Sequence, residues 1–363
     1  MHKPHPPVVR RASRVAALAA LAASLMLTAC GADDTTSEAS STTPSTTTTT
    51  TAETTTTNPS TTTTAAGSPN SGMRGPGGGS FPAAPAATKA DLAYATTSPA
   101  QRLDLWQPIK STAPTPLVIY IHGGAFKVGD KSMVGGKVQP LLDAGYAVAS
   151  LNYRLSGEAP FPAGAQDVKA AVRWLRSNAS TYNLDPNHFA AWGESAGGNL
   201  VALLGTTSDQ KTIFDDAGLG NADASSAVQA VVDWYGPTDF AQMDTQASSG
   251  EGGCPNPETH DPASSPESLW VGGAIQDHKD KVAQANPITY IATATKLPAF
   301  SIAHGDADCN VPVQQSKILA DALQTAGAQP KLTILPGASH ADAQFDGTLL
   351  APTIEWLGTV LGH

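Results

Sequence analysis

The sequence predicts an α/β fold, with a mostly parallel central sheet and helices on both of its faces. Short apolar runs of strand length alternate with helical patterns from about residue 90 onward. These runs lie at residues 117–121, 147–151, 189–192, 230–234, 300–303 and 331–335. Parallel strands need crossover connections, and the helices that supply them cover the sheet. A Gly-x-Ser-x-Gly pattern between one of these runs and a helical pattern supports the same fold.

The remaining elements follow from local patterns. Residues 92–95 and 103–106 predict an opening hairpin, because two short runs are separated by a Ser-Pro turn. A second helical pattern, from residue 313 to residue 326, stops at Gly327, a residue typical of helix C-caps. The clearest helix has apolar residues at i, i+3, i+4 and i+7, namely Val168, Ala171, Val172 and Leu175.

Residues 239–286 interrupt this alternation. They are rich in glycine, serine, proline and acidic residues, and they are too long for an ordinary connection between elements. We expect an inserted loop or a small cap over the functional site.

The N-terminal segment, residues 1–29, predicts a signal peptide. It begins with basic residues and continues with an apolar run over residues 15–27, which is shorter than the roughly 20 residues needed to span a bilayer. The sequence Leu-Thr-Ala-Cys that ends at Cys30 resembles the lipobox of bacterial lipoproteins. That resemblance implies cleavage before Cys30, lipidation of its thiol and anchoring outside the cytoplasmic membrane. A plain signal peptide is the alternative, and Arg10-Arg11 leaves the export route open.

Composition divides the rest of the chain into two parts. Residues 30–87 are rich in threonine, serine, proline and glycine, and they predict a disordered tether. Residues 88–363 have a globular composition. The formal charge is −10, and loss of the four basic residues in 1–29, which contain no acidic residue, would bring it to −14. Such a chain repels phosphate backbones, so a nucleic-acid partner is excluded.

Cysteine usage predicts a disulfide. The chain has three cysteines, and lipidation of Cys30 would leave Cys254 and Cys309 as a pair in an exported protein. Export favours their oxidation. Two free thiols are the alternative.

Residues 193–198, Gly-Glu-Ser-Ala-Gly-Gly, predict a nucleophile elbow. They follow an apolar run and precede a helical pattern. The turn is so tight that side chains flanking the serine would collide, which explains the glycines. Ser195 is therefore the candidate nucleophile.

A serine nucleophile needs a base and an orienting carboxylate. In the α/β-hydrolase arrangement both follow the serine in the chain, first the acid and then the histidine. Asp306 and Asp308 follow the run at residues 300–303 and compete for the role of the acid. His340 follows the run at residues 331–335 and is the candidate base. No histidine pair has metal-ligand spacing with a third partner, so we predict no metal.

The loop at residues 122–126 follows the run at 117–121 and predicts an oxyanion hole. Its small residues allow backbone N–H groups to approach a developing negative charge. The predicted donors are the N–H groups of Gly124, Ala125 and Ala196.

From about residue 90 to its end, the sequence resembles bacterial α/β-hydrolase esterases of the hormone-sensitive-lipase and xylan acetyl or feruloyl esterase type. The matching stretches are residues 122–126 (HGGAF), 152–154 (NYR), 161–162 (FP), 167–175 (DVKAAVRWL), 193–198 (GESAGG), 286–290 (NPITY) and 304–308 (HGDAD). The family has a third glycine where this chain has Ala125, whose N–H is retained. The family's acid lies three residues before the valine of a Val-Pro pair, which favours Asp308 and leaves Asp306 to cap the turn.

The resemblance implies ester hydrolysis through an acyl-enzyme by Ser195, Asp308 and His340, without a cofactor. The implied partner is a small-molecule or glycan ester, and membrane contact is through the lipid alone. Residues 248–268 are polar and lack an aromatic residue, which favours short-chain or polysaccharide-linked acetyl and feruloyl esters over long-chain lipids. A serine exopeptidase and a non-catalytic scaffold on the same fold are the alternatives.

Overall fold

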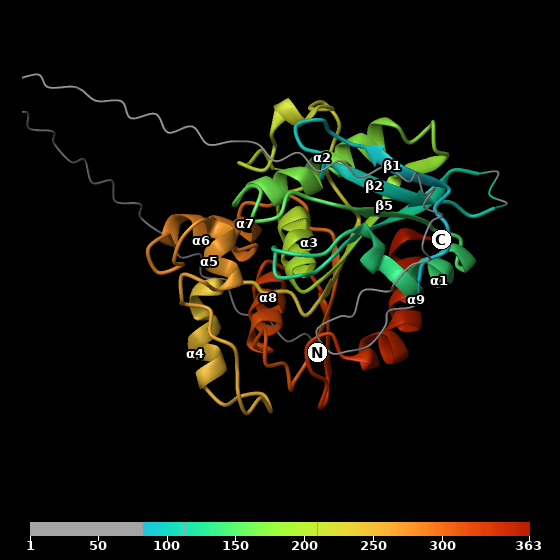
Figure 1. Ribbon diagram of the computed structural model, residues 1–363. Coiled ribbons are helices and arrows are strands. Elements are labelled where there is room, and N and C mark those ends of the chain that lie inside the picture. Colours follow the sequence, from blue (N-terminus) through green and yellow to red (C-terminus); the bar gives the residue numbers. More distant parts are fainter. Residues whose placement is uncertain (1–82, 110, 112, 209) are drawn as a thin grey trace, which may run out of the picture. The chain divides into compact units, whose positions relative to one another are not determined.

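The computed structural model describes residues 83–109, 111, 113–208 and 210–363 (Figure 1). The predicted signal peptide, Cys30 and the predicted tether up to residue 82 lie outside the described residues. Residues 83–87, which the sequence assigned to the end of the tether, already contact the folded part. The carbonyl of Pro85 accepts a hydrogen bond of 2.8 Å from the Trp106 indole, and Ala84 and Ala87 pack against a buried cluster.

The described strands form one sheet of eight strands in the order β1-β2-β4-β3-β5-β6-β7-β8. Strands β3 to β8 run parallel to one another, whereas β2 is antiparallel to both of its neighbours, β1 and β4. Their bounds are β1 Lys89–Ala93, β2 Arg102–Trp106, β3 Thr115–Ile121, β4 Ala147–Leu151, β5 Leu184–Glu194, β6 Ala230–Trp234, β7 Ala299–Gly305 and β8 Lys331–Leu335. The predicted α/β fold with its mostly parallel sheet is confirmed.

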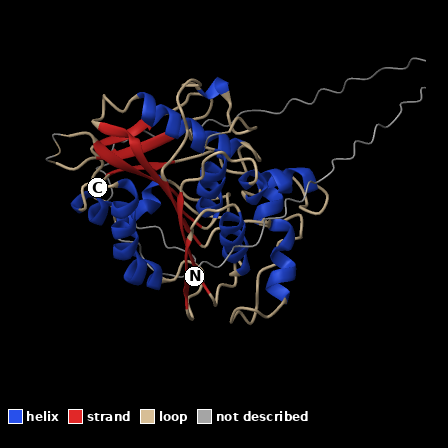
Figure 2. Cartoon of the chain, turned by 180° about the vertical axis from the view of Figure 1, so that it is seen from behind, coloured by secondary structure: helices blue, strands red, loops and turns tan. Residues whose placement is uncertain are grey.

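Helices cover both faces of this twisted sheet (Figure 2). They are α1 Val138–Asp143, α2 Ala163–Ser177, α3 Ala196–Thr207, α4 Met243–Ser248, α5 Pro266–Val271, α6 Lys279–Ala285, α7 Ile288–Ile291, α8 Gln314–Thr325 and α9 Leu350–Leu361. Short 3₁₀ segments span Lys131–Lys137, Ala217–Leu219 and Phe240–Gln242, and a π-helical turn spans Phe345–Leu349. No described helix is long and apolar enough to cross a bilayer.

The two faces have separate cores because side chains alternate along each strand. On β3, Leu117 and Ile119 join the cluster that includes α2, α3 and α8. Val118 and Tyr120, from the same strand, join the cluster that includes α1 and α9. A strand buried on both faces reads as a continuous apolar run, which is why the sequence revealed β3 so clearly.

The segment predicted as an inserted loop or cap, residues 239–286, is helical and packed. It contains α4, α5 and α6, which lie together beside α8 (Figure 1). Phe240 and Trp270 from this segment are buried against Phe126 of the predicted oxyanion loop. The Trp270 ring stacks on Phe126 with ring centroids 4.0 Å apart, and the Phe240 ring meets it edge to face with centroids 6.1 Å apart. Packing of the segment therefore positions a loop of the candidate site.

Candidate active site

Ser195 lies at the sharp turn between β5 and α3. Its backbone has φ 54° and ψ −122°, a conformation that non-glycine residues rarely adopt. A Cβ on Gly193 would lie 2.1 Å from the carbonyl oxygen of Gly197. A Cβ on Gly197 would lie 2.0 Å from the carbonyl oxygen of Ile121. The predicted collision is thus present in the geometry, and only glycine fits on either side of the serine.

The three residues predicted as nucleophile, base and acid lie in one hydrogen-bonded row. His340 Nε2 is 2.9 Å from Ser195 Oγ, and His340 Nδ1 is 2.7 Å from Asp308 Oδ2. The serine follows β5, the aspartate follows β7 and the histidine follows β8, so all three meet at the carboxyl edge of the sheet. Ligands bind at this edge in open α/β sheets.

Asp308, rather than Asp306, contacts the histidine. Its side chain is fully buried, and its Oδ1 accepts hydrogen bonds from the backbone N–H groups of Asn310 at 2.8 Å and Val311 at 2.9 Å. Burial alone would raise the pKa of Asp308, but the charge of His340 and the hydrogen bonds of two imidazoles outweigh it and hold that pKa below its usual range. Asp306 instead accepts a 2.6 Å hydrogen bond from Gly337 N–H, a turn-capping role.

The oxyanion loop lies directly against the serine. A Cβ on Gly123 would come 3.1 Å from Ser195 Cβ, which shows how closely the backbone approaches. No hydrogen bond of the described residues uses the N–H of Gly124 or Ala125. Ala196 is the first residue of α3, so its N–H has no acceptor within the helix. The three predicted donors remain free for a ligand.

His122, which begins this loop, has a structural role. Its ring stacks on Tyr153 with centroids 4.5 Å apart, and its Nδ1 is 2.7 Å from the carbonyl oxygen of Gly123. Burial lowers the pKa of His122 to about 4, so the imidazole is neutral near pH 7 and donates from Nδ1. This arrangement fixes the start of the oxyanion loop.

Residues 103–323 match the BD-FAE family. The chain belongs to that family. The match covers more than half of the chain and includes residues 122–126, residues 193–198 and Asp308, whereas His340 lies beyond its end. The sheet and its solved relatives place this BD-FAE member among the α/β-hydrolases.

Two curated relatives are esterases of Mycobacterium tuberculosis. Esterase LipC is 31% identical over 268 residues, which cover 73% of this chain and 62% of the relative. Probable carboxylic ester hydrolase LipM is 30% identical over 260 residues, which cover 69% of this chain and 55% of the relative. The chain thus spans about three fifths of the length of these relatives.

Solved structures show the same fold. A truncated carbohydrate esterase from gut microbiota is 33% identical, with a TM-score of 0.69, over 78% of this chain and 100% of that one. An acetyl ester-xyloside bifunctional hydrolase from Caldicellulosiruptor lactoaceticus is 22% identical, with a TM-score of 0.57, over 71% of this chain and 88% of that one. The second likeness supports the fold alone.

A buried ion-pair network lies beneath the elbow of this BD-FAE member, and the roles of Lys137 and Asp346 in it were not predicted. Lys137 Nζ is 2.7 Å from Glu194 Oε1 and 2.8 Å from Asp346 Oδ1. Tyr235 donates a 3.0 Å hydrogen bond to Glu194 Oε2, and its ring meets the His340 ring edge to face at 4.9 Å. Burial alone would lower the pKa of Lys137, but the two carboxylates outweigh it and raise that pKa. The network joins Glu194, which precedes Ser195, to the segment that follows His340.

Replacing Lys137 with methionine should lower the free energy of unfolding by about 3–5 kcal/mol, because it leaves a buried carboxylate without its partner. The matched control is Lys317→Met. Lys317 pairs with Glu251 at 2.6 Å, but the two side chains are 39% and 59% exposed, so its loss should cost at most about 1 kcal/mol. Urea unfolding of the two variants measures the difference. Equal losses would show that the Lys137 network contributes no more than a surface pair.

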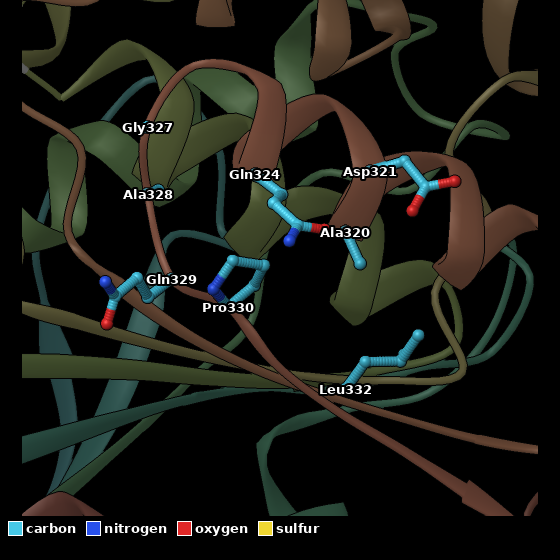
Figure 3. Close-up of a pocket in the computed structure, with 8 residues that line it drawn as sticks. All are labelled: Ala320, Asp321, Gln324, Gly327, Ala328, Gln329, Pro330 and Leu332. Carbon is cyan, nitrogen blue, oxygen red and sulfur yellow. The ribbon is translucent and has the colours of Figure 1, made fainter.

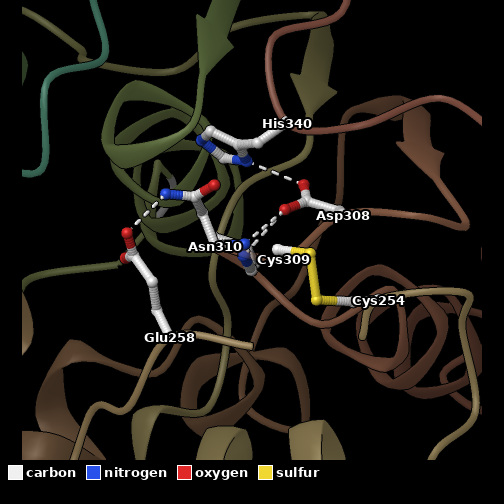
Figure 4. The surroundings of a disulfide bond; sticks show 7 residues. Cys254, Glu258, Asp308, Cys309, Asn310 and His340 are labelled. Carbon is white, nitrogen blue, oxygen red and sulfur yellow. Dashed lines mark hydrogen bonds and ion pairs between the residues drawn. A yellow bond between two sulfur atoms is a disulfide. The ribbon is translucent and has the colours of Figure 1, made fainter. Parts of the chain in front are cut away.

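The predicted disulfide is present. Cys254 and Cys309 are bonded, with Cα atoms 5.2 Å apart and 55 positions apart in the sequence. Cys309 directly follows Asp308, and Asn310 donates a 2.9 Å hydrogen bond to Glu258 (Figure 4). The Glu258 N–H also donates to the Cys309 carbonyl at 2.8 Å. The bond therefore ties the segment 239–286 to the loop that carries Asp308.

Loss of this disulfide should lower the free energy of unfolding by about 4 kcal/mol on the chain-entropy model. We expect mild reduction of the protein to lower its unfolding midpoint in urea and its activity together, because the loop of Asp308 loses its restraint. The Cys254→Ser/Cys309→Ser double variant is the control, and the reductant should not change it further. An unchanged midpoint after complete reduction would contradict this role.

A hollow of about 540 Å³ lies away from these residues. Figure 3 shows its lining, which comes from the end of α8, the connection that follows and the start of β8. The start of β8 is at the amino edge of the parallel sheet, opposite the edge that carries Ser195.

Among the described residues, no three His, Cys, Asp or Glu side chains form a group that could hold a metal ion.

Proposed function

We propose that this chain is a serine carboxylic-ester hydrolase that acts through an acyl-enzyme. The observation that carries the proposal is the row of contacts from Ser195 Oγ to His340 Nε2 at 2.9 Å and from His340 Nδ1 to Asp308 Oδ2 at 2.7 Å. The family membership and the esterase names of its relatives support the same activity.

The reaction has two halves. Ser195 Oγ attacks the ester carbonyl carbon while His340 Nε2 takes the hydroxyl proton, and the N–H groups of Gly124, Ala125 and Ala196 stabilise the oxyanion. The carbon–oxygen bond to the alcohol then breaks, and His340 gives its proton to the leaving alcohol. Water, activated by His340, attacks the acyl-serine and releases the acid. Asp308 stays ionised throughout and holds the imidazole in position.

The proposed substrates are short-chain or polysaccharide-linked esters, with acetyl and feruloyl groups as the acyl class. Residues 248–268 carry no aromatic side chain, so this part of the cap offers little apolar surface to a long acyl chain. The solved relative described as a carbohydrate esterase, which is 33% identical, supports the glycan ester.

A substrate panel tests this proposal. Purified protein is given p-nitrophenyl esters of increasing chain length, acetylated and feruloylated xylan, and p-nitroanilide peptides. We expect hydrolysis of acetyl to butyryl esters and of the glycan esters. An optimum beyond ten carbons would overturn the substrate class. Faster cleavage of the anilides would favour the exopeptidase, and no cleavage of any substrate would favour the non-catalytic scaffold.

We also propose that the chain is exported and anchored by a lipid on Cys30 at the outer face of the cytoplasmic membrane. The sequence around Cys30 and the disulfide of the described part, which is typical of oxidising compartments, support this location. Cells grown with a radiolabelled fatty acid should label the full chain and not its Cys30→Ser variant. Equal labelling of the two would contradict the anchor.

A further inference from the structure

A second imidazole touches the carboxylate of the proposed acid. His304 is the penultimate residue of β7, and its side chain is fully buried. Its Nε2 is 3.2 Å from Asp308 Oδ2 and 2.9 Å from the Val311 carbonyl oxygen. Its Nδ1 is 2.7 Å from the hydroxyl of Ser316 on α8. In the sequence, this histidine directly follows the apolar run at residues 300–303.

The hydrogen-bond partners of His304 indicate which of its ring nitrogens carries a hydrogen. Nε2 faces a carbonyl and a carboxylate, which only accept hydrogen bonds, so Nε2 carries the hydrogen. Ser316 can donate its hydroxyl hydrogen to Nδ1. His304 therefore donates from Nε2 towards Asp308 and Val311, and the Ser316 hydroxyl contacts its Nδ1.

This donor completes the environment of Asp308. Its Oδ1 accepts from two backbone N–H groups, and its Oδ2 lies within hydrogen-bond reach of both His304 and His340. Both backbone polar groups of Val311 are bonded, because its N–H donates to Asp308 and its carbonyl accepts from His304. The carboxylate cannot rotate without losing several of these contacts.

We propose that His304 is a positioning residue of the active site. It holds Oδ2 of Asp308 towards His340, and it withdraws part of the negative charge that Asp308 presents to the protonated His340. His304 touches no reacting atom, and it acts only through Asp308. The inference rests on the proposed function, because it assigns His304 to the same proton-transfer chain.

Other titratable groups near His304 could also change the pH profile, so their influence needs its own control. Asp233 on the adjacent strand β6 interacts electrostatically with His304, and burial raises the pKa of Asp233 to about 6. The Oδ2 atom of Asp233 has no hydrogen-bond partner. His340 lies beyond Asp308. An Asp233→Asn variant therefore serves as the control for any change in the pH profile.

The test compares His304→Leu, which removes the donor, with His304→Gln, which retains an N–H near the position of Nε2. In His304→Leu we expect kcat to fall about 10- to 100-fold, as is usual when an outer partner of a functional group is lost, with KM within about twofold. The acid side of its kcat/KM profile should move to higher pH, because Asp308 then stabilises the protonated His340 more strongly. His304→Gln should lie close to the wild type on both measures, and Asp233→Asn should not reproduce the upward shift.

Several outcomes would overturn the inference. One is a His304→Leu protein that melts earlier but keeps the kcat and pH profile of the wild type, since a purely structural role predicts this. Another is a His304→Gln variant as impaired as His304→Leu. Failure of the proposed function gives a different result, namely a wild type that hydrolyses no ester or a Ser195→Ala variant that is as active as the wild type.

If His304→Leu does not fold, ¹⁵N spectra of the wild-type protein with labelled histidines decide. The His304 signals are identified by their shift in the Ser316→Ala variant. A ring that carries a hydrogen on Nε2 supports the inference, and a ring protonated on Nδ1 alone overturns it, because its Nε2 cannot donate to Asp308.

Discussion

Replacing Ser195 with alanine lowers kcat for p-nitrophenyl acetate by about a millionfold, the loss expected when the nucleophile of a serine triad is removed. The remaining oxyanion donors and His340 cannot form an acyl-enzyme without the hydroxyl. Ser195 is partly exposed, and the substitution removes one hydroxyl group. The hydrogen bond that this hydroxyl loses is the 2.9 Å contact with His340. We therefore expect its melting temperature to stay close to that of the wild type, which separates loss of chemistry from loss of fold.

Ser339→Ala is the matched control, because Ser339 is exposed and directly precedes His340 in the chain. Its hydroxyl contacts Asp342 at 3.3 Å and no residue of the proposed triad. We expect the control to keep the wild-type rate. A Ser195→Ala protein that hydrolyses the ester at the same rate as the control would show that the nucleophile lies elsewhere.

Replacing Asp308 with asparagine lowers kcat by about ten-thousandfold, the size of effect known for the aspartate of a serine triad. Two backbone N–H groups bind Oδ1, so the amide oxygen of the asparagine is held there. Its NH₂ then takes the place of Oδ2 and faces His340 Nδ1, which can only accept from it. The His340 proton moves to Nε2, and the ring can no longer take a proton from Ser195.

Asp306→Asn provides the matched control for this prediction. Asp306 accepts from the Gly337 N–H, and an amide oxygen can accept the same hydrogen bond. We expect its kcat to remain within a few-fold of the wild type. The reverse pattern, with a severe loss in Asp306→Asn and a mild one in Asp308→Asn, would exchange the two roles.

The sequence predicted those features of the fold that depend on local pattern. The apolar runs at residues 147–151, 230–234 and 331–335 coincide with β4, β6 and β8. These strands are bounded by turn residues, so their length is visible in the chain. The row formed by Ser195, Asp308 and His340 was also predictable in outline, because each residue follows a recognisable strand and the carboxyl ends of parallel strands meet at one edge.

Other contacts between distant segments, which no motif marks, were not predictable. Lys137 stands in an unremarkable polar segment, and only the fold brings it to Glu194 and Asp346. In the sequence, His304 only follows an apolar run of strand length. Its contact with the Val311 carbonyl depends on the turn that brings the two residues together in the fold. The segment 239–286 has the composition of a loop, yet a few apolar residues, among them Trp270, are enough to dock its helices on the core. Local periodicity predicts which face of a helix or strand is buried, but it does not predict which distant residue that face contacts.

The most direct test of the central claim is covalent labelling with a fluorophosphonate probe, followed by mass spectrometry of the labelled peptides. The probe reacts with a serine hydroxyl that a neighbouring base activates, so it reports directly whether His340 activates Ser195. We expect one adduct, on the peptide that contains Ser195, with no adduct there in Ser195→Ala and much slower labelling in His340→Gln. An unlabelled wild-type protein, or an adduct at another residue that persists in Ser195→Ala, would contradict the assignment.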